Sequence, residues 1–231
     1  MISVIIPTYN EESALPDTLT ALCQQPMPFA VYVVDGGSTD RTGTLAEQFP
    51  HITVLSAPKG RASQMNSGAV RAIADHPDSQ GWLVFLHADT LLPSNAFTQL
   101  RKLEEDHNVQ AGGFLHQFSG DDWKLRMISW LDNFRCFRSR IIYGDQAMFV
   151  RQELFQRLGG FPDQPILEDV AFCERLIRHT IPKILSPPVI TDSRKFVKMG
   201  VWRSLARVFL IILCVEFRLP ILTPAFFKDI R

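Results

Sequence analysis

The feature that most constrains the fold is a regular alternation of short apolar runs with amphipathic segments over the first ninety residues. The runs are mostly β-branched or aromatic, which is typical of strands buried on both faces of a parallel sheet. They are Ile2–Ile6, Val31–Val34, Ile52–Leu55 and Trp82–Leu86, separated by helical patterns at Leu15 to Leu22, Leu45 to Phe49 and Met65 to Ile73. This spacing predicts an α/β fold with a mostly parallel, Rossmann-like sheet flanked by helices.

After about residue 93 the pattern becomes less regular. It predicts a helix containing Phe97 to Leu103, a strand Gln110–Phe118, a helix Trp123–Phe137, a short strand Ala147–Val150, a helix Val170–Ile177 and a short strand Ile184–Leu185. An apolar stretch with scattered arginines, Val201–Phe217, predicts a C-terminal helix. Because the sequence contains no internal repeat or linker, we expect a single domain.

Charge and cysteine content exclude several classes of protein. Lys plus Arg number 24 and Asp plus Glu number 24 in 231 residues, so the basic surface of a nucleic-acid binder is not expected. Four widely spaced cysteines without a Cys-x-x-Cys pair favour reduced thiols and a cytoplasmic location. The N-terminus resembles a strand rather than a signal peptide, and the longest late apolar run, Val208–Val215, is shorter than the roughly 20 residues that span a bilayer.

Polar residues follow three of the predicted strands, where ligands bind in open α/β sheets. Asp35 follows the second strand and is itself followed by Gly36-Gly37-Ser38-Thr39-Asp40. A carboxylate there is suited to accept hydrogen bonds from a nucleotide base or from ribose hydroxyls. The alternative is an ordinary turn in which Ser38 or Thr39 caps the next helix and Asp40 lies in its first turn.

His87-Ala88-Asp89 follows the fourth strand. An acidic residue at this point can hold a divalent cation and leave coordination positions open for phosphate oxygens. The alternative is a pair of side chains that hydrogen-bond a neighbouring loop. The other histidines, which show no metal-ligand spacing, are predicted to be structural or exposed: His51, His76, His107, His116 and His179.

Glu168-Asp169 precedes a predicted helix, where a carboxylate either caps the helix or acts as a general base on an acceptor hydroxyl. Two basic pairs, Lys59 with Arg61 and Arg194 with Lys195, are candidates for neutralising a diphosphate. Solvated surface charge is the alternative for both pairs. None of these motifs decides the function alone.

Taken together, the motifs resemble glycosyltransferase family 2, which has the GT-A fold. The resemblance rests on Ile5-Ile6-Pro7-Thr8-Tyr9-Asn10-Glu11-Glu12, Val33-Val34-Asp35-Gly36-Gly37-Ser38-Thr39-Asp40 and His87-Ala88-Asp89, in that order and spacing. Within the family, later motifs resemble the small arsenosugar-biosynthesis or radical-SAM-associated subgroup: Gly112-Gly113-Phe114, Tyr143-Gly144-Asp145-Gln146, Gly159-Gly160-Phe161-Pro162 and Leu167-Glu168-Asp169.

The resemblance implies a GT-A domain over residues 1–200, with a nucleotide-binding half at about 1–92, an acceptor half at about 93–200 and a helical tail at 201–231. It implies a nucleotide pocket lined by Pro7, Tyr9, Glu11, Asp35, Arg61 and Asn66. Gly113, Asp145 and Gln146 would border the acceptor and the donor sugar, and Asp169 would be the catalytic base. Arg194 would steady the leaving diphosphate.

The metal motif departs from the family. The common motif is Asp-x-Asp, and its first position here is His87. Imidazole carries no negative charge and suits softer cations than a carboxylate does. A divalent cation, Mg²⁺ or Mn²⁺, is therefore expected to depend on Asp89, with His87 as a second ligand.

The expected reaction is an inverting transfer from a UDP- or GDP-sugar to the hydroxyl of a small-molecule or lipid-linked acceptor. Two alternatives are a non-catalytic module that binds nucleotide sugars and a sugar-phosphate nucleotidylyltransferase. The second normally opens with a glycine-rich loop, which residues 5–12 lack. The C-terminal stretch and the Trp123–Arg140 helix each have two interpretations: peripheral contact with the inner face of a membrane, or packing on the domain or on a second subunit of a homodimer.

Overall fold

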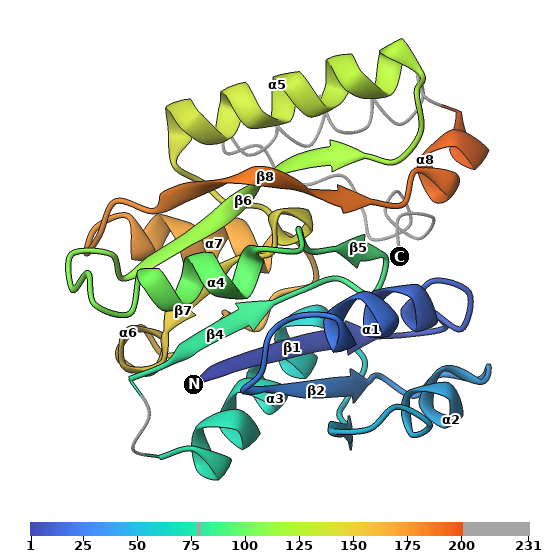
Figure 1. The fold of residues 1–231 in the computed structure, drawn as a ribbon, viewed down its shortest axis with the longest axis horizontal. Coiled ribbons are helices and arrows are strands. Elements are labelled where there is room, and N and C mark those ends of the chain that lie inside the picture. The colour runs from blue at the N-terminus through green and yellow to red at the C-terminus, as the bar shows by residue number, and fades with distance from the viewer. Residues whose placement is uncertain (78–79, 201–231) are drawn as a thin grey trace.

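A computed structural model describes residues 1–77 and 80–200 of the chain. One eight-stranded sheet runs through it in the order β3-β2-β1-β4-β7-β6-β8-β5 (Figure 1). The strands are β1 (Ile2–Thr8), β2 (Phe29–Asp35), β3 (Ile52–Ser56), β4 (Trp82–Phe85), β5 (Thr90–Leu91), β6 (Ala111–Phe118), β7 (Phe149–Arg151) and β8 (Lys183–Thr191).

The first four strands form the predicted parallel part of the sheet. β1 pairs in parallel with β2 and β4, and β2 pairs in parallel with β3. In this register Thr8 lies opposite Asp35, so the chain leaves β1 and β2 at the same edge. The prediction that these strands deliver their following residues to one edge is confirmed.

The remaining strands make the sheet mixed rather than purely parallel. β7 pairs antiparallel with both β4 and β6, and β5 pairs antiparallel with β8. β8 was predicted as a short strand before the prolines, but it runs through Pro187 and Pro188. Its parallel pairing with β6 shifts register between Phe114 and His116, opposite these prolines. The strand continues past them because proline, which lacks an N–H, is tolerated where the ladder is irregular.

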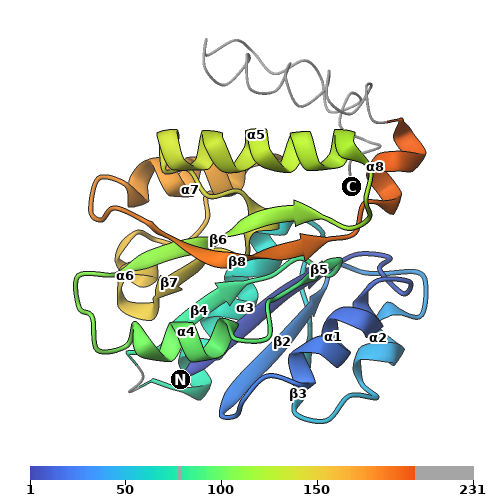
Figure 2. The same ribbon diagram turned by 45° about the horizontal axis from the view of Figure 1, so that its top comes forward.

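Helices cover both faces of the sheet (Figures 1 and 2). Residues on alternate positions of β1 point to opposite faces. Ile2, Val4 and Ile6 pack with α1 (Leu15–Cys23), α2 (Thr42–Ala46) and α4 (Ala96–Lys102). Ile5 packs with α3 (Arg61–Asp75), α6 (Gln152–Arg157) and α7 (Glu168–Leu176). These two cores hold the sheet between helical layers.

The two remaining helices lie near β6 and β8. α5 (Trp123–Ser139) lies beside β6 and β8, and α8 (Arg194–Met199) follows β8 (Figures 1 and 2). A small third core of Phe118, Leu125 and Ile128 joins α5 to β6. Within the described residues, no helix is both long and apolar enough to cross a membrane. The predicted tail helix at 201–217 lies outside the described residues.

Candidate active site

The carboxyl ends of β1 and β2 are joined by a buried amide that the sequence analysis did not single out. Nε2 of Gln64, on α3, donates to the carbonyl oxygens of Thr8 at 2.7 Å and Val34 at 2.8 Å. A Cβ on Gly36 would lie 3.0 Å from the same Nε2 atom. Gly36 therefore lets the backbone after β2 lie close to the Gln64 amide. Gln64 in turn fixes the ends of β1 and β2 relative to α3.

Asp35 is held by the turn that follows it. Its carboxylate accepts hydrogen bonds from the backbone N–H of Gly37 at 3.1 Å and of Ser38 at 2.9 Å, and from the Ser38 hydroxyl. The expectation that Ser38 or Thr39 caps the next helix is wrong, because α2 begins only at Thr42 and has no side-chain cap. Asp35 is thus placed at the predicted position, with its orientation set by its own turn.

The residues after β1 lie against this turn. The side chain of Asn10 accepts from the N–H of Thr39 at 2.8 Å, and the N–H of Glu11 donates to Thr42 at 2.8 Å. Pro7 is still within β1, while the ring of Tyr9 faces Nζ of Lys59 at 3.5 Å from the ring centre. Pro7, Tyr9, Glu11 and Asp35 therefore gather at one edge of the sheet, and their role in a nucleotide pocket stays a prediction.

Arg61 connects this edge to the acceptor half. It is the first residue of α3, and its guanidinium lies 3.3 Å from Nδ1 of His87 and 3.9 Å from Oε1 of Glu168. The Arg61 side chain remains half exposed, whereas that of Glu168 is buried. Arg61 therefore presents a positive charge to solvent between the end of β4 and the start of α7.

Asp169 is buried beside this arginine and is held by backbone donors. Its carboxylate accepts from the N–H of Gly144 at 2.7 Å and from the N–H of Val170 at 2.8 Å. Burial raises the pKa of Asp169 above its ordinary value. Arg61 and the two N–H groups act in the opposite direction, because they stabilise the charged form. A carboxylate with a raised pKa and fixed orientation suits proton abstraction.

Gly144 has no room for a side chain. A Cβ there would lie 2.5 Å from Nε2 of His87 and 3.5 Å from a carboxylate oxygen of Asp169. The backbone of Gly144 is therefore wedged between the residue after β4 and the first turn of α7. From the sequence, Gly144 was noted only as part of a motif, because its neighbours His87 and Asp169 are far away in the sequence.

Gly113 lies close to the backbone of Gln146, whereas Asn66 binds the backbone of Phe161. A Cβ on Gly113 would lie 3.2 Å from the carbonyl oxygen of Gln146. The Gln146 side chain is buried and accepts from the N–H of Tyr143 at 3.0 Å. The amide of Asn66 pairs with both backbone groups of Phe161, at 2.8 and 2.9 Å. The predicted role of Asn66 at the nucleotide stays a prediction.

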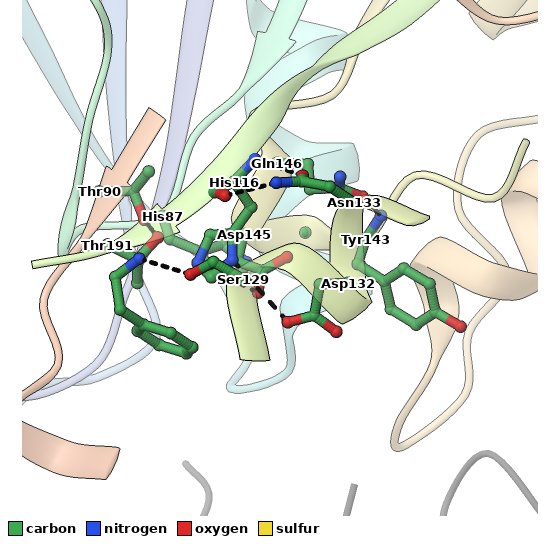
Figure 3. Close-up of polar contacts among 12 residues, drawn as sticks. His87, Thr90, His116, Ser129, Asp132, Asn133, Tyr143, Asp145, Gln146 and Thr191 are labelled. Carbon is green, nitrogen blue, oxygen red and sulfur yellow. Dashed lines mark hydrogen bonds and ion pairs between the residues drawn. The ribbon is translucent and has the colours of Figure 1, made fainter. Parts of the chain in front are cut away.

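A second titratable cluster lies between β6, α5 and the short helix η1 (Gly144–Gln146) (Figure 3). His116 is 1% exposed, and its two ring nitrogens each lie 3.8 Å from a carboxylate, Asp132 on α5 and Asp145 on η1. Burial, and then the charge of Asp145, raise the pKa of Asp132 to about 6, although Arg135 opposes this shift from 3.1 Å. His116 was predicted to be structural or exposed, since no motif surrounds it.

Arg194 is placed next to the Asp89 loop by the pairing of β5 with β8. The N–H of Asp192 donates to the carbonyl oxygen of Asp89 at 2.9 Å, and the hydroxyls of Thr90 and Thr191 lie 3.0 Å apart. The exposed Arg194 guanidinium pairs with the Asp192 carboxylate. β5 was not predicted from the sequence. Its pairing with β8 brings the backbone of Asp89 to that of Asp192, two positions before Arg194.

The polar residues after β1 and β2 thus lie at one edge of the sheet, and Arg61 lies between His87 at the end of β4 and the buried carboxylate of Asp169. A model of a known family, described as Glycosyl transferase family 2, matches residues 3–181 of the chain. The chain belongs to glycosyltransferase family 2. The resemblance found in its motifs is therefore confirmed at the level of the family.

This family 2 chain is similar to several curated glycosyltransferases. It is 28% identical over 199 residues to the O-antigen chain rhamnosyltransferase RfbN of Salmonella typhimurium, an alignment covering 77% of this chain and 61% of that protein. It is 30% identical over 179 residues to a PGL/p-HBAD biosynthesis glycosyltransferase of Mycobacterium tuberculosis, covering 70% and 63%. The chain thus spans less than two thirds of the length of these relatives.

Solved structures show the same fold. The complex of S. aureus TarS 1-349 with UDP-GlcNAc superposes with a TM-score of 0.66 at 20% identity, covering 84% of this chain and 58% of that one. The mannosyltransferase PcManGT of Pyrobaculum calidifontis, in complex with GDP-Man and Mn2+, gives a TM-score of 0.66 at 24% identity, covering 99% and 67%. The family 2 chain therefore has a GT-A-like α/β fold with a curled mixed sheet.

The donor atoms at the end of β4 fit a cation that needs one protein carboxylate. Among residues 1–77 and 80–200, no three His, Cys, Asp or Glu side chains are grouped to hold a metal ion. Nδ1 of His87 lies 3.3 Å from the Arg61 guanidinium, and its Nε2 lies where a Cβ on Gly144 would be. Mg²⁺ commonly binds through one carboxylate and the oxygens of substrate phosphates. Asp89 in the family 2 enzyme matches that requirement.

Proposed function

We propose that this enzyme is an inverting glycosyltransferase that moves a sugar from a nucleotide-diphosphate donor to an acceptor hydroxyl. The observation that carries the proposal is Asp169, a buried carboxylate held by two backbone N–H groups beside the Arg61 guanidinium. Family membership supplies the reaction class, and this geometry supports the base.

In the proposed reaction, Asp169 accepts the proton of the acceptor hydroxyl as its oxygen attacks the anomeric carbon. The bond from that carbon to the donor phosphate oxygen breaks on the opposite face, and its electron pair leaves with the nucleoside diphosphate. Such a single displacement inverts the anomeric centre and needs no covalent enzyme intermediate. Because two backbone N–H groups already hold the Asp169 carboxylate in place, less reorganisation is required in the transition state.

Cations stabilise the negative charge that develops on the leaving diphosphate. A divalent cation, Mg²⁺ or Mn²⁺, would be held by Asp89 and would supply electrostatic stabilisation of the phosphate oxygens. Arg61 and Arg194 bring positive charge to the same edge. In this proposal His87 orients Arg61 rather than ligating the metal, because its Nδ1 lies 3.3 Å from the guanidinium.

The remaining predicted residues divide between donor and acceptor. Pro7, Tyr9 and Glu11 would line the nucleotide pocket with Asp35 at the base, and Asn66 would shape the pocket through the backbone of Phe161. Gly113 and Gln146 would shape the sugar site by close backbone contact, while the partly exposed Asp145 would accept hydrogen bonds from sugar hydroxyls.

Solved neighbours were crystallised with donors of both base types, UDP-GlcNAc in TarS and GDP-Man in PcManGT. We propose a UDP- or GDP-sugar donor for this chain on that basis. The acceptor is a small molecule or is lipid-linked. Membership of the arsenosugar or radical-SAM-associated subgroup, the cytoplasmic location and a homodimer all remain predictions from the sequence.

The test is Asp169→Asn, compared with the nearby exposed control Asp163→Asn. We expect Asp169→Asn to lower transfer by about 10³-fold or more, because a general base alone contributes roughly 10²–10⁴ and the amide also loses the negative charge. Binding of UDP or GDP, measured by thermal shift with Mn²⁺, should stay within about twofold of wild type, since in this proposal Asp169 acts on the acceptor hydroxyl and not on the nucleotide.

Two outcomes would decide between the proposal and its alternatives. Normal turnover by Asp169→Asn would remove Asp169 from the role of base. Nucleotide binding by the wild type without transfer to any acceptor would favour a non-catalytic module. Release of pyrophosphate from a nucleoside triphosphate and a sugar phosphate would instead indicate a nucleotidylyltransferase.

A further inference from the structure

Helix α5 carries two apolar faces on opposite sides. Its inner face packs on β6 through buried side chains that include Leu125 and Ile128. The outer face carries four exposed aromatic residues at helical spacing, which we call the α5 stripe: Trp123 at 58% exposure, Trp130 at 62%, Phe134 at 52% and Phe137 at 50%. A surface helix normally presents polar residues on its outer face, so this stripe requires a partner.

The α5 stripe is a continuous patch. The rings of Trp130 and Phe134 are stacked with their centres 5.7 Å apart, and exposed Leu131 lies beside them. Other strongly exposed apolar residues of the described chain, such as Val70 and Ile181, lie in separate segments. Single exposed apolar residues are common on protein surfaces, but four aromatic residues along one helix are not.

Cations flank the stripe. Residues 123–140 contain five basic side chains and one acidic one, although the whole chain has a net charge of zero. The acidic residue, Asp132, pairs with Arg135 on the inner side. The other four cations are Lys124, Arg126, Arg138 and Arg140. Positive charge is therefore concentrated on this helix, and an anionic partner is favoured.

The same charges argue against the two occupants that the chain itself could supply. Residues 201–231 contain five basic and two acidic side chains, so the tail has the same sign as α5. A second copy joined through a two-fold axis would bring α5 against α5, again with like charges. Aromatic residues bordered by arginine are instead typical of helices that lie in the interface of an anionic bilayer.

The position of α5 links such a surface to the site. On its inner face Asp132 lies 3.8 Å from Nδ1 of His116, whose Nε2 lies 3.8 Å from Asp145 (Figure 3). Asp145 follows Gly144, which donates to the proposed base Asp169. Only one layer of side chains thus separates α5 from the acceptor side of the site.

We propose that the α5 stripe docks the enzyme on an anionic lipid bilayer and holds the acceptor side of the site at the headgroup level. The inference rests on the proposed function in one respect, namely that the acceptor is lipid-linked. Docking itself depends only on the aromatic residues and cations of α5.

Vesicle sedimentation with the full chain tests the docking. We expect binding to vesicles of phosphatidylcholine mixed with phosphatidylglycerol, weak binding to phosphatidylcholine alone, and weakening by salt. Trp130→Ser combined with Phe134→Ser should lower binding by about tenfold or more, because two large apolar side chains no longer enter the interface. Arg126→Glu combined with Arg138→Glu should lower it at least about 25-fold, since each cation contributes roughly fivefold.

The matched control is Val70→Ser combined with Ile181→Ser, which removes two exposed apolar side chains away from α5. This variant should bind vesicles as the wild type does. The proposal is overturned if the wild-type protein does not bind anionic vesicles. It is also overturned if the α5 variants bind vesicles as well as the wild type does, which is the result expected if the tail alone makes the contact. A wild-type dimer that the Trp130/Phe134 variant abolishes would identify a second copy as the occupant, and would also overturn it.

Nucleotide binding by thermal shift, without vesicles, separates this inference from the proposed function. The α5 variants should bind UDP or GDP as the wild type does, because the stripe lies outside the nucleotide edge. Vesicle binding by a wild type that binds no nucleotide would refute the proposed function and leave docking intact.

Discussion

The two halves of the sheet position their polar side chains in different ways. At the ends of β1 and β2, side chains are held by short turns: Asp35 bonds residues two and three positions later. In the second half, the contact that holds Asp169 comes from Gly144, which lies in another element. The orientation of Asp35 is thus set by its own turn, whereas the loop after β1 and the proposed base both depend on contacts between elements.

The largest expected effect is that of Gly144→Ala. The new Cβ would lie 2.5 Å from Nε2 of His87, so either the His87 ring or the Gly144 turn must move, and movement of the turn shifts the N–H that holds Asp169. We expect kcat/KM to fall by about 10²-fold, since displacements of about 1 Å can cost that much. Transfer kinetics measure the loss, and nucleotide affinity should change little because the Asp35 turn is held by its own hydrogen bonds.

The matched control is Gly43→Ala in α2, where an added Cβ meets nothing within 4 Å. Alanine at this position should leave transfer unchanged and slightly favour the helix. Equal activity of both variants would show that the base does not depend on the Gly144 turn, and would remove the proposed contrast between the halves.

The second prediction tests a long-range contact of the nucleotide half. Gln64→Ala removes a buried amide that donates to the carbonyl oxygens of Thr8 and Val34 and accepts from the N–H of Gly60. We expect the free energy of unfolding to fall by about 2–3 kcal/mol, because three hydrogen bonds of about 1 kcal/mol each are lost. Denaturant unfolding checks this, with the exposed Gln48→Ala as control. An unchanged stability would mean that the turns alone hold these strand ends.

The smallest expected effect concerns the pH dependence at Asp132. Its pKa is raised to about 6 in the folded protein, chiefly by burial, whereas an unfolded Asp titrates near 3.9. Between these values the folded state binds more protons, so this group lowers stability as pH rises from about 4 to about 6. We expect Asp132→Asn to match the wild type near pH 4 and to be more stable by about 2 kcal/mol above pH 6, since a shift of two pKa units corresponds to at most roughly 2.7 kcal/mol.

Unfolding measured across this pH range checks the prediction. Ser129→Ala is a suitable control, because it removes another buried contact between α5 and β6, the hydroxyl that accepts from Phe118. Ser129→Ala should lower the free energy of unfolding by a similar amount at every pH and leave the pH dependence caused by Asp132 unchanged. If Asp132→Asn has the same pH slope as wild type, the acceptor cluster does not titrate as described.

Sequence patterns predicted the first half of the fold well, because its strands are short, β-branched and separated by regular helical spacing. The helix α5 was also predicted within two residues of its end, 137 against 139. β5 was missed because its two residues exist as a strand only through pairing with β8. β8 was predicted too short because Pro187 and Pro188 normally end strands, and a register shift opposite them preserves it here.

For the site, motifs predicted which residues come together but not how they are oriented. Asp35 lies at the end of its predicted strand and Asp169 at the start of its predicted helix, since both elements were recognisable. His116 and Gln64 were missed, because a single His or Gln within an ordinary strand or helix has no local pattern. Their partners lie 16 to 56 positions away, a distance over which only the packed fold supplies the contact.

The two edges of the sheet are short strands. β3 has five residues and β5 has two, so neither edge offers a long row of unpaired N–H and C=O groups to another chain. Short edges protect sheets against edge-to-edge aggregation. Self-association of this chain at high concentration should therefore proceed through side-chain surfaces, and a charged additive that screens α5 should influence it more than a β-sheet breaker would.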